Sequence, residues 1–183
     1  MVGDRQSAPE WWRQGQVIVG MARMGESGMD ESMPMLGMSH VAICVRNLDR
    51  TLRFYRDLLG FRVVKDALQD TQTGGLPHLY RDRHAQRRVV HLQAGAGSSM
   101  PILVITEHPG DVVAGEPIML DQVGISHLSF TVASVDALTK RLLAQGAETC
   151  GPPDAFKDAQ GRIRTVFFRD PDGILVQFDE GLE

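Results

Sequence analysis

An internal repeat constrains the fold of this chain more than any other feature of its sequence. One stretch of alternating apolar residues begins at His40, and a second begins at His127, 87 residues later. In each copy an aspartate follows the histidine by nine residues, and a glycine ends the predicted helix. These residues are Asp49 and Asp136, and Gly60 and Gly146. The histidines and the aspartates repeat at a spacing of 87 residues and the glycines at 86. Three such matches indicate a duplicated structural unit.

Each copy shows the same order of predicted elements, which is one strand, one helix and three further strands. In the first copy the strands are expected at residues 39–45, 61–64, 88–92 and 102–106, with the helix after Asn47. In the second copy they are expected at 126–132, 147–150, 164–168 and 174–178, with the helix after Ser134. Alternating apolar residues mark the strands, and apolar residues three or four apart mark the helices. The sequence therefore predicts an α+β protein of two tandem βαβββ modules.

The repeat also suggests the bounds of the parts. We expect an N-terminal arm at residues 1–36, a first module at 37–110, a linker at 111–121 and a second module at 122–183. Seven of the nine methionines lie in the first 38 residues. Two interpretations of this arm stay open, a flexible segment and a segment that contacts a second subunit.

Composition excludes several classes of function. The chain has 183 residues and a net charge of −4, which argues against a nucleic-acid partner held by a basic surface. An apolar content of 43% with 23% charged residues is typical of a globular domain. Two cysteines are too few for a disulfide scaffold, so a cytoplasmic location is expected. No stretch has the roughly 20 apolar residues of a membrane span, so no membrane partner is expected.

The two repeated histidines predict a metal site. Each begins the first strand of its module, on the face opposite the apolar residues that a helix should cover. If the modules pair into one curved, partly open, barrel-like sheet of eight strands with the helices outside, that face becomes a shared concavity. His40 and His127 would then converge from distant parts of the sequence, as metal ligands do.

The chain resembles the vicinal oxygen chelate superfamily. The resemblance is carried by SHVAICVRNLDRTLRFYRDLLGF, ISHLSFTVASVDALTKRLLAQGA and FFRDPDGILVQF, and it covers about residues 36–183. This superfamily includes glyoxalase I, extradiol dioxygenases, methylmalonyl-CoA epimerase, and the bleomycin and fosfomycin resistance proteins. The resemblance implies a divalent metal and a small-molecule substrate with two adjacent oxygens.

The resemblance also implies a ligand set of His40, His127 and Gln177. Position 177 is usually glutamate in the superfamily and is glutamine here, whose amide oxygen brings no negative charge. The corresponding position in the first half is approximately Val104, where some relatives carry glutamate. A site with these three ligands and no glutamate at position 104 is similar to that of extradiol dioxygenases, which keeps coordination positions open for substrate and dioxygen.

Several functions stay open on this basis. The favoured one is a small dioxygenase-like enzyme that uses Fe²⁺, or another metal-dependent enzyme acting on a small molecule. The first alternative is a glyoxalase-type lyase or isomerase that uses Zn²⁺, Ni²⁺, Mn²⁺ or Mg²⁺. The second is a metal-free, resistance-type protein that binds a drug or metabolite. Small members of the superfamily usually dimerise, so the resemblance also implies a homodimer.

Other polar residues are candidates for the site. Alternation places His91 on the concave side of its strand, where it could act as a general base. His78 and Tyr80, in the loop before that strand, and Arg164, in the second module, are candidates for binding substrate. The remaining histidines, His84 and His108, are expected to be surface residues.

Overall fold

A computed structural model describes residues 36–95 and 101–181 of this chain. From Gly37 onward the chain forms one compact unit. The arm predicted at residues 1–36 lies outside the described residues, apart from Leu36. In the described part of the chain, no helix combines the length and the apolar character needed to cross a membrane.

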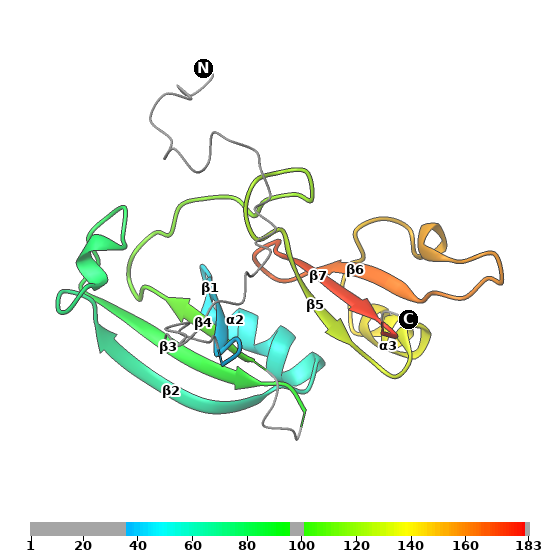
Figure 1. Ribbon diagram of the computed structural model, residues 1–183, viewed down its shortest axis with the longest axis horizontal. Coiled ribbons are helices and arrows are strands. Elements are labelled where there is room, and N and C mark those ends of the chain that lie inside the picture. The colour runs from blue at the N-terminus through cyan, green and yellow to red at the C-terminus, as the bar shows by residue number, and fades with distance from the viewer. Residues whose placement is uncertain (1–35, 96–100, 182–183) are drawn as a thin grey trace, which may run out of the picture. The chain divides into compact units, whose positions relative to one another are not determined.

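The first half forms a four-stranded sheet in the order β1-β4-β3-β2 (Figure 1). β1 runs parallel to β4, and the other two pairs are antiparallel. The elements are β1 (His40–Cys44), α2 (Leu48–Leu52), η2 (Arg53–Leu58), β2 (Arg62–Asp70), η3 (Leu76–His78), β3 (Gln86–Gln93) and β4 (Ile102–Glu107). The predicted βαβββ order of the first half is therefore confirmed.

The second half forms a separate sheet of three strands, in the order β5-β7-β6. Its elements are β5 (His127–Thr131), α3 (Val135–Ala144), η4 (Pro153–Phe156), β6 (Thr165–Arg169) and β7 (Leu175–Asp179). The strand predicted at 147–150 is reduced to a single bridge between Thr149 and Phe168. Two consecutive prolines follow it at 152 and 153, and proline has no N–H to extend a ladder. A single eight-stranded sheet is therefore not confirmed among the described residues.

The two halves repeat their local helix signals. The side chains of Asn47 and Ser134 each accept a hydrogen bond from the backbone N–H three residues later, at 2.8 and 3.2 Å. Gly60 and Gly146 end the two helical segments with φ of +81° in both cases. Only glycine takes this conformation without steric cost, which confirms their predicted role at the helix ends.

Each sheet has one buried face and one open face. In the first sheet, the paired residues Val90 and Ile105, and Leu92 and Leu103, are buried in the main core. The core continues into the second half, because the ring of Phe61 meets that of Phe130 edge to face at 5.2 Å. The opposite faces of both sheets lie outside this core and carry polar side chains together with a few buried aliphatic ones, such as Val89 and Val104.

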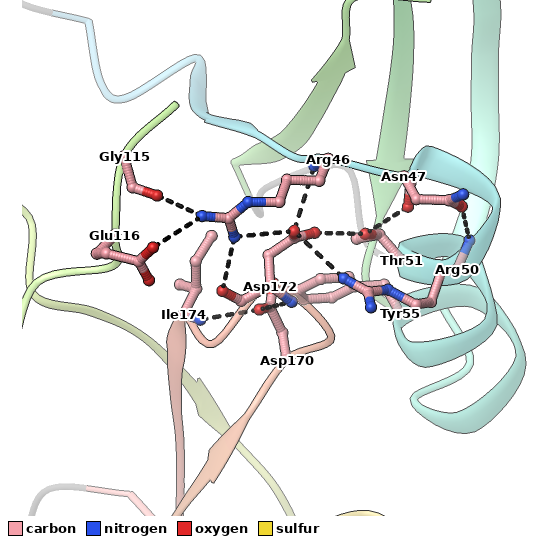
Figure 2. A network of polar contacts seen from close by, with 10 residues as sticks. All are labelled: Arg46, Asn47, Arg50, Thr51, Tyr55, Gly115, Glu116, Asp170, Asp172 and Ile174. Carbon is pink, nitrogen blue, oxygen red and sulfur yellow. Dashed lines mark hydrogen bonds and ion pairs between the residues drawn. The ribbon is translucent and has the colours of Figure 1, made fainter. Parts of the chain in front are cut away.

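A buried turn between β6 and β7 ties the two halves together (Figure 2). Asp170 is 4% exposed, and its Oδ1 accepts from the backbone N–H groups of Asp172 and Ile174, both at 2.9 Å. Its Oδ2 accepts a hydrogen bond at 3.2 Å from the hydroxyl of Tyr55, which lies in η2 of the first half. One carboxylate thus holds its own turn and a residue more than 100 positions away.

Asp172 makes a second set of contacts with the first half. It is 8% exposed and lies at the start of α2, where it accepts from the backbone N–H of Arg46 at 3.2 Å. The Thr51 hydroxyl donates to its Oδ2 at 3.3 Å, and the guanidinium groups of Arg46 and Arg50 lie 3.4 Å from its Oδ1. A buried carboxylate is stabilised by such N–H donors and cations.

We predict that replacing Asp170 costs far more stability than replacing its partner. Asp170→Ala removes three hydrogen bonds and leaves two backbone N–H groups without an acceptor, so we expect a loss of about 3 kcal/mol. Tyr55→Phe removes only one hydrogen bond and should cost about 1 kcal/mol. Urea unfolding of both variants and the parent chain measures the difference. Equal losses would show that the turn does not depend on this carboxylate.

Candidate metal and substrate site

The open face of the first sheet forms a cavity of about 440 Å³. In the register of the sheet, Val104 of β4 lies beside Ala42 of β1 and His91 of β3, and His91 lies opposite Lys65 of β2. His40 lines the same cavity. The structure therefore confirms the predicted concave position of His91 and places it in one cavity with His40.

This cavity carries positive charge. Its lining includes Lys65 and Arg87 as well as the two imidazoles, and none of the described residues that line it is a carboxylate. Desolvation lowers the pKa of His91 below its ordinary value, and the neighbouring Lys65 lowers it further. Both effects favour the neutral imidazole, which can accept a proton. A negatively charged small molecule is the ligand that such a surface favours.

His127 and Gln177 lie on the open face of the second sheet. In the register His127 pairs with Leu175, and Gln177 lies between Ser129 and Phe167. The Gln177 amide donates from Nε2 to the Thr165 hydroxyl at 3.0 Å, which leaves its carbonyl oxygen available as a ligand. His127 lines a smaller cavity of about 200 Å³ together with residues 41–44 of β1. The three predicted ligands thus share open faces, but His40 and His127 line different cavities.

The donors nevertheless fit a metal ion in their chemistry. A serine precedes each histidine, and the Oγ–Nδ1 distance is 2.9 Å both for Ser39 with His40 and for Ser126 with His127. When the ring donates its Nδ1–H to the serine, Nε2 keeps its lone pair. Metal-binding histidines are usually oriented by such a hydrogen bond on the other ring nitrogen. The repeat therefore duplicates the supporting serine as well as the histidine.

The predicted substrate residues lie elsewhere. His78 and Tyr80 line a cavity of about 630 Å³ beside the loop between β2 and β3. Arg164 precedes β6, where its exposed guanidinium lies 3.9 Å from the carboxylate of Asp158. The structure does not bring these three residues together with His40. Their role in binding substrate stays a prediction.

The prediction that His108 is a surface residue is wrong, because His108 is only 4% exposed. Its ring stacks on that of His84 with centroids 3.8 Å apart, and the His84 side chain is 13% exposed. The antiparallel pairing of β3 with β4 causes this, since the loop before β3 meets the residues after β4. If the strands predicted at 88–92 and 102–106 are paired as an antiparallel hairpin, the contact between His84 and His108 can be expected from the sequence.

Sequence reasoning also missed Lys65 and Arg87. The sequence predicts only the beginning of this strand, at residues 61–64, whereas β2 continues to Asp70 and carries Lys65 and Gln69 on the cavity side. The alternation in residues 62–70 is obscured by a register shift between Val63 and Lys65. This irregularity hides the period of two by which a strand is found in a sequence.

These features can be compared with those of known proteins. A model of the Glyoxalase/Bleomycin resistance protein/Dioxygenase superfamily matches residues 37–178, and the chain belongs to this superfamily. A 2-epi-5-epi-valiolone epimerase from an Actinomyces species is 27% identical over 148 residues, which cover 78% of each protein.

Solved structures support the same fold. A glyoxalase family protein from Bacillus cereus matches with a TM-score of 0.66 at 20% identity, over 84% of this chain and 99% of that one. A variant of the fosfomycin resistance protein FosX from Listeria monocytogenes, in complex with Mn(II) and 1S,2S-dihydroxypropylphosphonic acid, matches with a TM-score of 0.54. Its identity is 20%, over 81% of this chain and 95% of that one.

Proposed function

We propose that this chain is a metal-dependent isomerase that moves a proton at a carbon next to a carbonyl group. Its substrate would be a small molecule with two adjacent oxygens, such as an α-hydroxy ketone. The observation that carries the proposal is the position of His91, which lines one cavity with His40, Lys65 and Arg87, where the described residues contribute no carboxylate. A base next to a site for an anion is what proton abstraction requires.

His40, His127 and Gln177 would hold the divalent ion. A divalent ion held by these residues would supply Lewis-acid chemistry, which increases the acidity of the C–H next to a substrate oxygen. Zn²⁺, Ni²⁺, Mn²⁺ and Mg²⁺ all suit this chemistry. Because two neutral imidazoles and one amide oxygen add no negative charge, the ion would keep its full charge of +2. The substrate anion would then be attracted more strongly than by a site containing glutamate.

Residues of the chain would complete the reaction. His91 takes the proton from carbon on its free ring nitrogen. The ammonium of Lys65 and the guanidinium of Arg87, which line the same cavity, stabilise the negative charge that develops on the substrate oxygens. His91 can then return the proton to the same carbon. Inversion of the stereocentre, the type of reaction named for the Actinomyces relative, also requires that the deprotonated substrate turn its other face to His91 or receive the proton from a second donor.

A dioxygenase reaction with Fe²⁺ is the second candidate. It is favoured by Val104, an aliphatic residue at the fourth position that leaves a coordination position for dioxygen. It is disfavoured by Gln177, because the usual facial triad has a carboxylate there. A proton-transfer reaction needs no such carboxylate, and the chain supplies a base for it. We therefore place the isomerase first.

We further propose that the site forms in a homodimer. In one chain His40 and His127 line different cavities, and both lie on open sheet faces. A second copy could place its three-stranded sheet over the His40 cavity of the first. This arrangement would bring the four-stranded sheet of one subunit against the three-stranded sheet of the other, in a partly open enclosure. Each of the two sites would then combine His40 of one subunit with His127 of the other.

We predict that both repeated histidines are needed for metal uptake. Asp111 lies 2.7 Å from His84, from its Oδ2 to the ring Nδ1, and together with His108 these side chains could hold a separate ion. In a chain that carries Asp111→Asn to weaken that cluster, the parent should bind one Mn²⁺ or Zn²⁺. His40→Ala and His127→Ala should each abolish that binding, because two of the three donors do not hold an ion tightly. Metal content after dialysis measures this, and His78→Ala is the matched control on an exposed loop. Full uptake in both variants would remove the proposed site.

We predict that His91 is required for proton transfer but not for metal binding. The probe is 2-epi-5-epi-valiolone in D₂O, and proton NMR follows the loss of one C–H signal and the appearance of the other epimer. His91→Asn should slow this exchange by about 100-fold or more, with an unchanged metal content. Exchange at the parent rate would exclude His91 as the base. Oxygen consumption with Fe²⁺ and a catechol, without exchange, would instead support the dioxygenase.

We predict that two inactive variants restore activity when mixed. In a dimer whose sites lie between subunits, a mixed pair of His40→Ala and His127→Ala chains has one site with both histidines intact. Unfolding and refolding the two variants together should therefore recover a substantial part of the parent exchange rate. If each site lies within one chain, every site in the mixture lacks a histidine, and no activity would return.

A further inference from the structure

A second group of metal-binding side chains lies outside the cavity of the first sheet. Among the described residues, His84, His108 and Asp111 each offer a ligand atom, and these atoms lie within 4.8 Å of one another. His84 comes from the loop before β3, whereas His108 and Asp111 follow β4. The antiparallel pairing of these strands brings the two segments together. The backbone N–H of Asp111 bonds to the His108 carbonyl at 3.1 Å, which fixes the turn that presents the carboxylate.

The contacts within this cluster are those of oriented ligands. Nδ1 of His108 lies 3.3 Å from the carbonyl oxygen of Gln86. Because a carbonyl oxygen only accepts, the proton must be on Nδ1, and Nε2 then carries a lone pair. Nδ1 of His84 lies 2.7 Å from Oδ2 of Asp111. A ring nitrogen fixed by a backbone carbonyl is the usual support for a metal-binding histidine.

Binding an ion requires an adjustment of the side chains. A zinc ion holds imidazole nitrogens and carboxylate oxygens at about 2.0–2.2 Å, so the ligand atoms must come closer than the 4.8 Å that now encloses them. Because the two rings are stacked with an angle of 23° between their planes, one ring must also turn to point its nitrogen at the ion. His108 is buried and held by Gln86, whereas the His84 and Asp111 side chains are 13% and 41% exposed. The adjustment therefore falls to His84 and Asp111.

Tyr80 provides an independent indication of a ligand. Its hydroxyl is buried and has no hydrogen-bond partner in the part of the chain that the structure describes. Its ring edge contacts both His84 and His108, at centroid distances of 5.5 and 5.1 Å. An unpaired buried hydroxyl is destabilising, and an oxygen atom bound beside it would offset that cost. Tyr80 and His84 both line the cavity of about 630 Å³.

We propose that His84, His108 and Asp111 form a second divalent-metal site, best suited to Zn²⁺. Two imidazoles and one carboxylate leave a bound ion with a net charge of +1, compared with +2 for the set of His40, His127 and Gln177. This site should therefore bind the ion more tightly than the site of the proposed reaction. Three protein ligands leave one coordination position for water or for an oxygen of a small molecule in the adjoining cavity.

The test is a zinc titration of the full chain, followed by calorimetry and by metal analysis. The His40→Ala chain should still bind one Zn²⁺, and adding Asp111→Asn to it should weaken binding about tenfold or more. His84→Gln should have the same effect, and Asp121→Asn, which changes an exposed aspartate outside the cluster, should have none. Asp111 is exposed, so its variant should fold normally, which circular dichroism checks. With Co²⁺ as the probe, visible absorption bands should appear in the His40→Ala chain and disappear with Asp111→Asn.

Two results would overturn this proposal. One is a His40→Ala chain that binds no Zn²⁺, and the other is a folded Asp111→Asn variant whose zinc affinity is unchanged in the same background. The experiment also separates this site from the proposed function. If His40→Ala leaves the zinc stoichiometry of the parent unchanged while Asp111→Asn lowers it by one, the second site stands and the ligand set of the reaction fails.

Discussion

The burial of two aspartates at one tight turn is the interaction on which the rest of this structure depends. Asp170 and Asp172 are buried at the turn between β6 and β7, and hydrogen-bond donors must compensate both carboxylates for their lost hydration. The donors come from the turn itself and from residues 46–55 of the first half (Figure 2). Burial raises the pKa of Asp170, although its N–H and hydroxyl donors oppose this shift. Docking on residues 46–55 of the first half thus supplies the hydrogen-bond donors for these two carboxylates that the turn itself lacks.

This docking buries one face of each sheet and leaves the candidate functional side chains on the opposite face. The core takes one face of each strand, so the alternate residues, among them His40, His91, His127 and Gln177, remain on open faces. The first sheet adds two cations to that face and no carboxylate. The same alternation that builds the core therefore also collects the groups for binding an anion and moving a proton. The metal-dependent isomerase is proposed on that basis.

Much of the fold could be predicted from the sequence because its signals are local and repeated. Asn47 and Ser134 cap the helices, and Gly60 and Gly146 end them, through contacts within a few residues. Features set by distant contacts were harder to predict. The extension of β2 to Asp70 depends on its partner β3, and the burial of His108 depends on the pairing of β3 with β4. No local pattern of residues records either.

The candidate site was only partly predictable for the same reason. Alternation placed His91 correctly on the open face, and the repeat identified His40 and His127. Whether the two histidines meet depends on how sheets pack, and the sequence carries no short-range signal for that. The proposed ligands His40, His127 and Gln177 bring no negative charge, whereas the second cluster contains the carboxylate of Asp111. This cluster likewise forms only when the chain is folded.

The most direct measurement of the central claim is the position of a bound ion. Anomalous diffraction from a crystal of the full chain grown with Mn²⁺ would locate it without assumptions about activity. Our account predicts a peak bound by Nε2 of His40 and Nε2 of His127, at about 2.0–2.2 Å from each, with the two histidines contributed by different subunits. Manganese density only at His84, His108 and Asp111, with the rings of His40 and His127 apart and empty, would contradict it.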